Sequence, residues 1–310
     1  MHKSVVAVCA GALALALSLV GAAPVIALPA DPADAHILVF ANAGVNDTSA
    51  SGEVDRTITA LQELGGTVTT FDGGDGSDTA WTAALVGIDV LSLPEPERGS
   101  LYVAGGTPFM SVAAATVVKN WVSAGGQVVA NATFGAGSSY EPLLSFLTGL
   151  DYSTVFQPTV EFGLVWELQD DRILGAPAAL TWVDGTYSFQ NYGTWDAALK
   201  AGVTPIYLSA DQQSMAVGSF SVGSGAFVFL AYDWYSDPVA APDEIADWVT
   251  VLQLATQAFP TEAPVVVVPP APQPELAEAG ADGTHLAVGG GVLLLLGVSL
   301  LFLRRRALAA

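Results

Sequence analysis

Residues 88–130 contain a strand, a helix and a second strand in succession. The first strand reads Ile88-Asp-Val-Leu-Ser-Leu93 and the second reads Gln127-Val-Val-Ala130. Between them, Ser111 can cap a helix that ends at Gly125-Gly126 and whose apolar residues recur at helical spacing: Ala114, Val117, Val118 and Trp121. Short apolar strands that alternate with helices indicate parallel pairing, because the crossover helices cover both faces of the sheet.

The same alternation extends toward the N-terminus. Ile37-Leu-Val-Phe40 and Thr67-Val-Thr-Thr-Phe71 are expected strands. A helix capped by Ser51 is predicted between them, with Val54, Ile58 and Leu61 on its inner face, and a short helix is predicted around Trp81–Leu85.

Regular structure returns at the end of the domain. Ser214–Phe220 and Ala226–Tyr232 are expected to form a hairpin through Val222-Gly-Ser-Gly225, and a last helix is expected from Pro242. We therefore predict an α/β fold over residues 31–260, a flavodoxin-like parallel sheet flanked by helices.

The middle of this domain, residues 151–210, differs in composition and is predicted to be an irregular or β-rich insertion. Its aromatic residues form a cluster in the sequence: Trp166, Trp182, Tyr187, Phe189, Tyr192 and Trp195. Such residues are more often core than ligand-binding, although aromatic rings also stack on sugars. Both interpretations stay open at this point.

The first 30 residues have the layout of a secretory signal peptide. Lys3 precedes an uncharged apolar run that ends in small residues before Asp31, and cleavage is expected near Ala30, with Ala22 or Ala23 as alternatives. Cys9 is the only cysteine, so the mature chain would contain no disulfide and no cysteine nucleophile.

The other end predicts a membrane anchor. Residues 261–285 are a proline-rich linker, residues 286–303 are uncharged and long enough to cross a bilayer, and residues 304–310 form a basic tail. Arg304, Arg305 and Arg306 favour a cytoplasmic C-terminus. The domain is thus expected at the extracellular face of the cell membrane or cell wall, as a single-pass protein.

A short motif precedes the apolar run: Leu276, Ala277, Glu278, Ala279 and Gly280. With the apolar run and the basic tail, it resembles the cell-wall sorting signal of Gram-positive bacteria in its Leu-Ala-x-Thr-Gly form. The resemblance implies sortase and the cell wall as partners. Ala279 stands where that signal has its threonine, and an ordinary membrane anchor is the alternative.

The chain is strongly acidic, with a formal net charge of -21. Between Asp31 and Pro260 there are 26 acidic residues and five basic ones. A surface of this sign repels phosphate backbones, so nucleic acid is excluded as an expected partner. No cofactor is predicted.

Two parts of the domain resemble a known superfamily. Ile88-Asp-Val-Leu-Ser-Leu-Pro94, Trp121-Val-Ser-Ala-Gly-Gly126 and Val128-Val-Ala-Asn-Ala-Thr133 look like class I glutamine amidotransferase-like domains. The segment Gly225-Ala-Phe-Val-Phe-Leu-Ala-Tyr-Asp-Trp234 resembles the closing segment of their trehalose-utilisation-type relatives. The resemblance covers residues 36–135 and 214–258.

The resemblance also places the residues that its chemistry requires. The catalytic cysteine of the superfamily corresponds to about Ala132, and the partner histidine is missing, because His36 is the only histidine between the two ends. A nucleophile without a thiol or a base is not activated. The domain is therefore expected to be non-catalytic.

Ligands of parallel sheets collect at the carboxyl ends of the strands. The polar residues expected there are Asn42, Asn46, Asp47, Asp72, Asp75, Glu95, Glu97, Asn131, Thr133 and Asp233. Acids and amides without cations suit a sugar or a metal better than a phosphate, and turn chemistry is the alternative explanation. The run Asp72–Asp78 is interpreted as a turn, and no metal site is predicted.

Three functions follow from these features. The leading hypothesis is a non-catalytic surface module with a binding or structural role, which predicts no clustered acids in a deep cleft. A carbohydrate- or wall-binding protein predicts two or more exposed tryptophans in a row. A carboxylate- or metal-dependent glycan hydrolase predicts two carboxyls about 5–10 Å apart across a pocket.

Overall fold

The computed structural model describes residues 34–63, 65–132, 139–155, 158–159, 162–169, 175–234 and 242–257. The predicted signal peptide, linker, sorting-like motif, apolar run and arginine tail lie outside these residues. Within the described residues, the search for a helix long and apolar enough to cross a membrane finds none.

One half of the sheet is parallel, as the sequence predicts. Its strands lie in the order β2-β1-β3-β4-β11, and every neighbouring pair is parallel. The strands are β1 (His36–Phe40), β2 (Thr67–Phe71), β3 (Val90–Leu93), β4 (Gln127–Asn131) and β11 (Gly225–Leu230). All residues of β3, β4 and β11 are buried, which explains why their sequences are mostly apolar.

The other half of the same sheet is antiparallel. It continues from β11 through β10 (Met215–Val222), β9 (Val203–Ser209), β6 (Val165–Leu168) and β7 (Ala179–Thr181). The strands β5 (Pro158–Thr159) and β8 (Ser188–Phe189) pair with each other, and β8 also pairs with β10. The predicted hairpin is confirmed, with Val222 paired to Gly225 at the turn. The described strands of the middle segment therefore extend the sheet.

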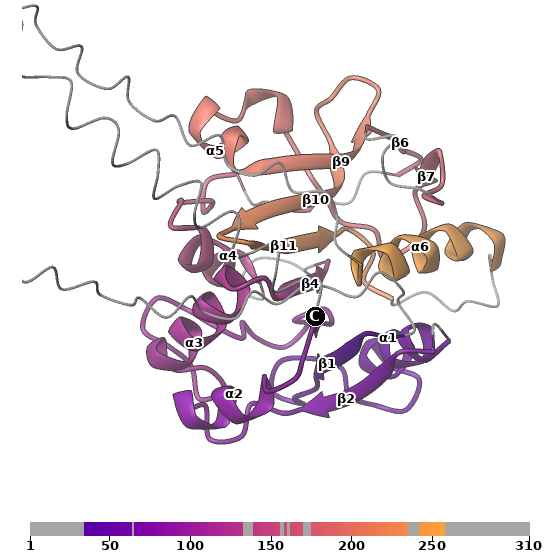
Figure 1. Cartoon of the computed structure of the whole chain (residues 1–310). Helices are drawn as coiled ribbons and strands as arrows, with labels where there is room; N and C mark the ends of the chain where they lie inside the picture. The colour runs from indigo at the N-terminus through magenta and orange to yellow at the C-terminus, as the bar shows by residue number, and fades with distance from the viewer. Residues whose placement is uncertain are drawn as a thin grey trace, which may run out of the picture. The chain divides into compact units, whose positions relative to one another are not determined.

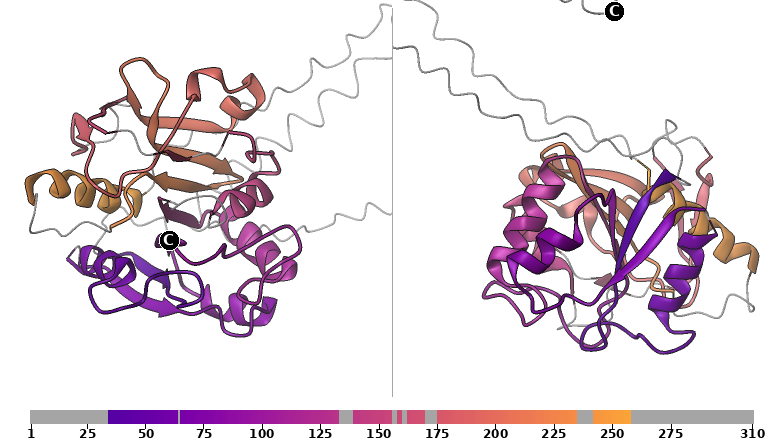
Figure 2. Two further views of the ribbon diagram at one scale, coloured as in Figure 1. Left: turned by 180° about the vertical axis from the view of Figure 1, so that it is seen from behind. Right: turned by 60° about the horizontal axis from the view of Figure 1, so that its bottom comes forward.

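Helices lie on both faces of the sheet (Figure 1). On one face lie α2 (Asp78–Ala84), α3 (Val112–Ser123) and α4 (Glu141–Thr148), and on the other lie α1 (Glu53–Gln62) and α6 (Pro242–Ala255), as the reversed view also shows (Figure 2). The shorter elements are the 3-10 helix η2 (Tyr192–Thr194) and α5 (Ala197–Ala201). The mixed α/β fold with helices flanking a partly parallel sheet is confirmed.

The start of α1 differs from the prediction. Ser111 caps α3 through a bond from Ala114 N, as expected, but the cap residue of α1 is Gly52. Ser51 has a φ of 64°, and a Cβ on Gly52 would come within 2.6 Å of the Asp47 carboxylate. The prediction that Ser51 caps this helix is therefore wrong. Glu53 becomes the first helical residue, and its side chain is buried.

Candidate functional site

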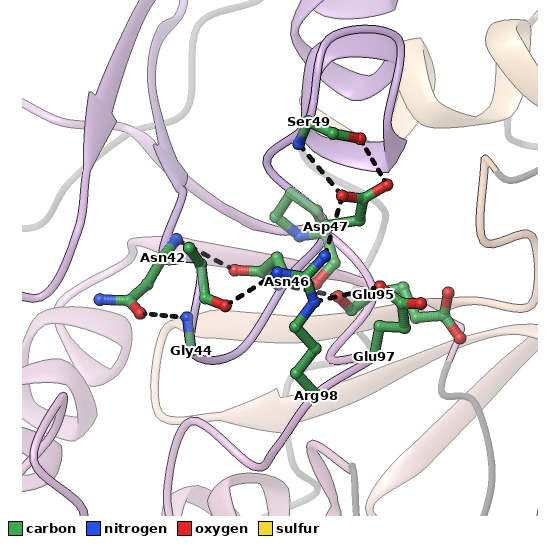
Figure 3. Close-up of polar contacts among 10 residues, drawn as sticks. Asn42, Gly44, Asn46, Asp47, Ser49, Glu95, Glu97 and Arg98 are labelled. Atoms are coloured by element: carbon green, nitrogen blue, oxygen red, sulfur yellow. Dashed lines mark hydrogen bonds and ion pairs between the residues drawn. The ribbon is translucent and has the colours of Figure 1, made fainter.

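A loop after β1 is organised around the buried amide of Asn46. Its Nδ2 donates hydrogen bonds to the backbone oxygens of Pro94, at 2.9 Å, and Glu95, at 2.8 Å. The Tyr140 hydroxyl also donates to the Pro94 oxygen. Figure 3 shows Asn46 between the two loops. This amide ties the loop after β1 to the loop after β3.

Asp47 strengthens the same connection. Its carboxylate accepts from Ser49 N at 3.1 Å and Ser49 Oγ at 2.9 Å, and it pairs with Arg98 at 3.3 Å (Figure 3). The backbone bond from Ser49 and then the Arg98 charge hold the pKa of this carboxyl below its usual range. Arg98 also lies 3.7 Å from Glu97.

Asn42 and Asp72 form a separate and exposed contact. Asn42 Nδ2 donates to the Asp72 backbone oxygen at 2.6 Å, and the Asp72 carboxylate accepts from Gly74 N at 2.9 Å. Asp75 accepts from Ser77 N in the same way, at 3.0 Å. These are the bonds of a polar turn. Among the described residues, no group of three acids, histidines or cysteines is placed to hold a metal ion.

A different set of residues converges on a pocket of about 290 Å³ at the carboxyl edge of the parallel strands. We call it the acid pocket. Glu53 contributes from the start of α1, Glu95 and Glu97 follow β3, and Asp233 follows β11. The segment between β7 and β8 supplies the remaining lining residues: Asp184, Gly185 and Tyr187. Clustered acids in a pocket are the opposite of what the leading sequence hypothesis predicted.

Glu53 and Glu95 are the most deeply placed acids of this pocket, at 3% and 2% exposure. Their carboxyl groups are hydrogen-bonded to each other. Apart from that contact, Glu53 Oε2 and Glu95 Oε1 have no hydrogen-bond partner among the described residues. Buried carboxyls usually receive N–H donors, so this pair is not satisfied by the fold.

The pKa values of both carboxyls are raised. Burial, followed by the charges of Glu97 and Asp47, raises the pKa of Glu53 to about 7. Burial, followed by the charges of Asp233 and Glu53, raises the pKa of Glu95 to about 10. At neutral pH, Glu95 therefore carries a proton and Glu53 accepts it in their shared hydrogen bond.

Asp233 is held by backbone contacts with the segment that faces it. Its N–H donates to the Gly185 oxygen at 3.0 Å, and Tyr232 forms an isolated antiparallel bridge with Thr186. Gly185 has a φ of 87°, and a Cβ there would collide with the Asp233 carboxylate. A glycine is thus required where Asp233 enters the pocket, and Asp233 is 2% exposed.

The residues at the end of β4 lie elsewhere. Asn131 is fully buried, and its Nδ2 donates to Thr57 Oγ1 at 3.5 Å, while its Oδ1 has no partner among the described residues. Ala132, at the position of the expected nucleophile, is also fully buried. Thr133 lies outside the described residues. Neither Asn131 nor Ala132 lines the acid pocket.

The aromatic residues of the middle segment belong mainly to the core. Trp166, Phe189, Tyr192 and Trp195 are buried, while Trp182 and Tyr187 are half-buried. The seven tryptophans all lie among the described residues, and none of them is exposed. The row of exposed rings that a sugar-stacking surface requires is therefore absent from this segment as described.

A larger pocket, of about 410 Å³, lies between α1 and α6. Its lining combines Arg56 and Trp234 with exposed acids such as Glu63. Arg56 donates to the Trp234 oxygen at 3.0 Å across this pocket. No deeply buried carboxyl faces this pocket among its described lining residues, so the acid pocket is the stronger candidate site despite its smaller volume.

The structure thus separates the sequence-predicted residues into three groups. Glu95, Glu97 and Asp233 meet in the acid pocket, Asn46 and Asp47 hold the loops beside it, and Asn42 with Asp72 forms a turn contact. Sequence reasoning missed Glu53 and Asp184. The acidic first turn of α1 was the available signal for Glu53, but it is equally typical of an exposed helix start.

Comparisons with known proteins reach only distant structures. No family model matches the chain, and no curated protein matches it. An exo-β-1,4-mannosidase from Opitutaceae bacterium strain TAV5 is similar over 73% of this chain and 37% of its own, at 12% identity and a TM-score of 0.45. The chain thus spans well under half of that enzyme.

Smaller solved proteins are similar over most of their length. A ThuA-like protein from Bacteroides uniformis matches 73% of this chain and 91% of its own, at 10% identity and a TM-score of 0.45. A cytoplasmic protein from Salmonella typhimurium matches 71% and 98%, at 11% identity and a TM-score of 0.44. Likeness at this distance assigns no function, which has to be argued from the residues of the chain itself.

Proposed function

We propose that this chain is an exported surface protein, anchored at the outer face of the cell membrane or in the cell wall, whose α/β domain binds a small ligand. Three features support this location: the signal-like residues 1–30, the apolar run 286–303 and the arginines that follow it. The motif 276–280 supports attachment to the wall by sortase as one form of this anchoring.

The scaffold proposed for the domain is a flavodoxin-like, amidotransferase-like sheet without its chemistry. The order β2-β1-β3-β4-β11 is the order of flavodoxin-like sheets, which supports this part of the proposal. Ala132 offers no nucleophile, and His36 lies at the start of β1, the opposite end of the strand from the acid pocket. These residues support binding without amidotransferase-type turnover.

The acid pocket is the observation that carries the binding role. A buried carboxyl in a purely structural position is normally paired with a base or with N–H donors. Glu53 and Glu95 instead turn to each other and to Asp233, which costs folding free energy through burial and like-charge repulsion. A pocket that contains two buried carboxyls without a base or an N–H donor among the described residues is typical of a ligand site.

Binding can be tested on the purified full chain by thermal shift and calorimetry. The probes are glucose, N-acetylglucosamine, glucosamine, butylamine and butanol, and the variants are Glu95→Gln and Glu167→Gln. Glu167 is exposed on β6 and provides the same change of charge away from the pocket. Binding of at least one probe that Glu95→Gln weakens and Glu167→Gln preserves supports the proposal. Indifference of every probe to Glu95→Gln rejects it.

The proposed location at the cell surface has its own test. Protease added to intact protoplasts should remove residues 31–260 and leave the Arg304–Arg306 tail protected, whereas a protected domain contradicts export. Wall attachment predicts that the mature protein stays with wall fragments after detergent. Extraction by detergent with residues 286–303 still attached would identify a membrane anchor alone.

The proposed lack of amidotransferase chemistry is tested by assaying the full chain for glutaminase, peptidase and esterase turnover. None above background is expected, and Ala132→Cys should not create any, because no histidine is available as base among the described residues near it. Robust hydrolysis that is lost on changing Asn131 or Thr133 would contradict this.

A glycan hydrolase is the second candidate, because one observation favours it. Glu95 holds a proton at neutral pH beside Asp233, as a general acid must. Glu53 and Glu95 are too close to flank a glycosidic bond, so Glu95 and Asp233 would be the working pair. Release of nitrophenol from aryl glycosides, abolished by Glu95→Gln, would establish this candidate in place of simple binding.

A further inference from the structure

The described lining of the acid pocket is acidic apart from one glycine and one phenol. The neighbouring guanidinium groups have other partners: Arg98 pairs with Asp47 and Glu97, and Arg56 donates to the Trp234 oxygen. Burial, followed by the charge of Asp233, raises the pKa of Tyr187 to about 12, so its phenol remains neutral. Coulomb repulsion therefore excludes phosphate and carboxylate ligands from this pocket.

The unsatisfied atoms of the pocket are oxygens. Glu53 Oε2 and Glu95 Oε1 are buried, and apart from the hydrogen bond that the two carboxyls share, neither has a partner among the described residues. Both belong to side chains more than nine-tenths buried that line the pocket. A ligand that completes them has to supply hydrogen-bond donors, and a positive charge strengthens each bond it makes to a carboxylate.

Three kinds of ligand supply donors or positive charge here. A metal ion needs several carboxylates around one point, and no such group exists among the described residues. A sugar hydroxyl donates one hydrogen bond but supplies no positive charge to the acidic pocket. A primary ammonium group has three donors, no acceptor and a full positive charge, so it satisfies the oxygens and also offsets the negative charge of the pocket.

Resting on the proposed binding function, we propose that the acid pocket takes the primary ammonium group of a small organic ligand. Glu53 and Glu95 are its hydrogen-bond acceptors, and Glu97, Asp184 and Asp233 line the same pocket. The Asp233 carboxylate lies where a Cβ at position 185 would be, so Gly185 is needed for this acid to lie in the pocket. A pocket of about 290 Å³ suits a ligand the size of an amino sugar, a short polyamine or one lysine side chain.

Ammonium binding has a consequence that neutral ligands lack. The cation favours the ionised carboxyls, so Glu95 has to release its proton when the ligand binds near neutral pH. The charges that face Glu53 and Glu95 come from α1, from the loops after β1 and β3, from the segment before β8 and from the end of β11. These groups are Asp47, Arg56, Glu97, Asp184, Tyr187 and Asp233. Binding should consequently tighten as pH rises from 6 toward 8.

Calorimetry on the full chain with matched probes tests this. Butylamine is compared with butanol, glucosamine with N-acetylglucosamine, putrescine with butanediol, and a glycyl-lysyl-glycine peptide with its Nε-acetylated form. Each amine should bind at least about tenfold more tightly than its neutral counterpart. The best amine identifies the source of the ammonium group, and enthalpies in buffers of different ionisation heat should show proton release.

Variants separate the possible outcomes. Glu95→Gln should weaken amine binding at least about tenfold and abolish proton release, while Glu167→Gln should change neither. Equal binding of amines and neutral counterparts overturns the ammonium proposal, as does tighter binding of calcium chloride than of any amine. If neutral sugars bind and Glu95→Gln weakens that binding, the proposed binding function is supported and only the ammonium proposal is rejected. If Glu95→Gln changes the binding of no probe, both the binding function and the ammonium proposal are rejected.

Discussion

Two buried polar regions lie side by side at the carboxyl edge of the sheet and differ in how their polar atoms are satisfied. Around Asn46, each described polar contact is a hydrogen bond between neutral groups, and the Asn46 amide reaches two carbonyl oxygens at 2.8 and 2.9 Å. Around Glu53 and Glu95, the two carboxyls share one hydrogen bond, and Glu53 Oε2 and Glu95 Oε1 have no other partner among the described residues. The first region completes the fold, and the second is the site proposed to bind a ligand.

The contact between the two regions makes this comparison informative. Asn46 donates to the backbone oxygen of Glu95, the residue whose side chain enters the acid pocket. The amide network therefore positions an acid that is itself unfavourable for folding. Hydrogen bonds that hold a buried, destabilising carboxyl in place are consistent with the proposed binding role of Glu95.

Asn46→Ala should produce the largest loss of stability. It removes the bonds to the Pro94 and Glu95 oxygens, and only the Pro94 oxygen keeps another described donor, the Tyr140 hydroxyl, so we expect a loss of about 3 kcal/mol in the free energy of unfolding. Urea unfolding followed by tryptophan fluorescence measures it. Asn42→Ala is the control, because Asn42 is half-buried and its amide makes one such bond, and it should cost less than about 1 kcal/mol. Equal losses would erase the distinction between the two amides.

Gly185→Ala should damage the acid pocket itself. The added Cβ meets the Asp233 carboxylate at a backbone φ of 87°, so both strain and collision contribute. We expect a loss of about 2 kcal/mol beyond that of Gly87→Ala, which has a φ of 71° and open space around its Cβ. Urea unfolding compares the two variants, and a similar cost for both would mean that Asp233 moves aside without penalty.

Glu95→Gln should stabilise the domain, opposite in sign to Asn46→Ala. The pKa of Glu95 is raised from 4.5 to about 10, so above pH 4.5 the unfolded chain releases a proton that the folded chain keeps. The stability supplied by protonated Glu95 is complete below pH 4.5 and is lost as pH rises toward 10. The advantage of the variant over the native chain should therefore widen between pH 5 and pH 8, by at most about 1.4 kcal/mol per pH unit.

Urea unfolding of both proteins at several pH values measures this difference, and Glu167→Gln controls for the change in net charge. Glu53 adds a contribution of the same sign between pH 4.5 and about 7. A difference between Glu95→Gln and the native chain that stays constant with pH would mean that Glu95 ionises normally in the folded state.

The parallel half of the sheet could be predicted from sequence because its strands are buried on both faces. Val128 and Val129 in β4, or Phe227, Val228 and Phe229 in β11, are consecutive apolar residues without the apolar–polar alternation of a strand that has one exposed face. Helix α4 was not predicted, although Leu143, Leu144 and Leu147 lie at helical spacing on its buried face. Its eight residues follow a glycine-rich stretch, and so short an element gives little periodic signal.

The acid pocket could be predicted only in part. Glu95 and Asp233 follow strands, so the rule for strand ends selected them. Glu53 lies 42 positions before Glu95 in the sequence, and Asp184 belongs to a segment whose sequence is predicted to be irregular. Contacts between loops depend on the packing of several elements, which no local pattern records. The sequence pattern also could not show that the Asn46 amide would form structural hydrogen bonds to backbone oxygens and so be unavailable to a ligand.

The smallest effect is expected for Asp72→Asn. This variant tests whether an acid at this edge of the sheet, but outside the acid pocket, contributes to stability or to amine binding. Asp72 is exposed, and its carboxylate accepts one bond from Gly74 N at 2.9 Å, which the side-chain oxygen of asparagine can accept equally well. The change should alter the free energy of unfolding by less than about 0.5 kcal/mol and leave amine binding unchanged. Calcium should not shift the melting temperature of either protein, because the nearby acids are engaged in turn bonds and no described group of three is placed to share an ion. Loss of amine binding in Asp72→Asn, or a calcium-dependent rise in melting temperature that this variant abolishes, would move the ligand site from the acid pocket to the turn after β2.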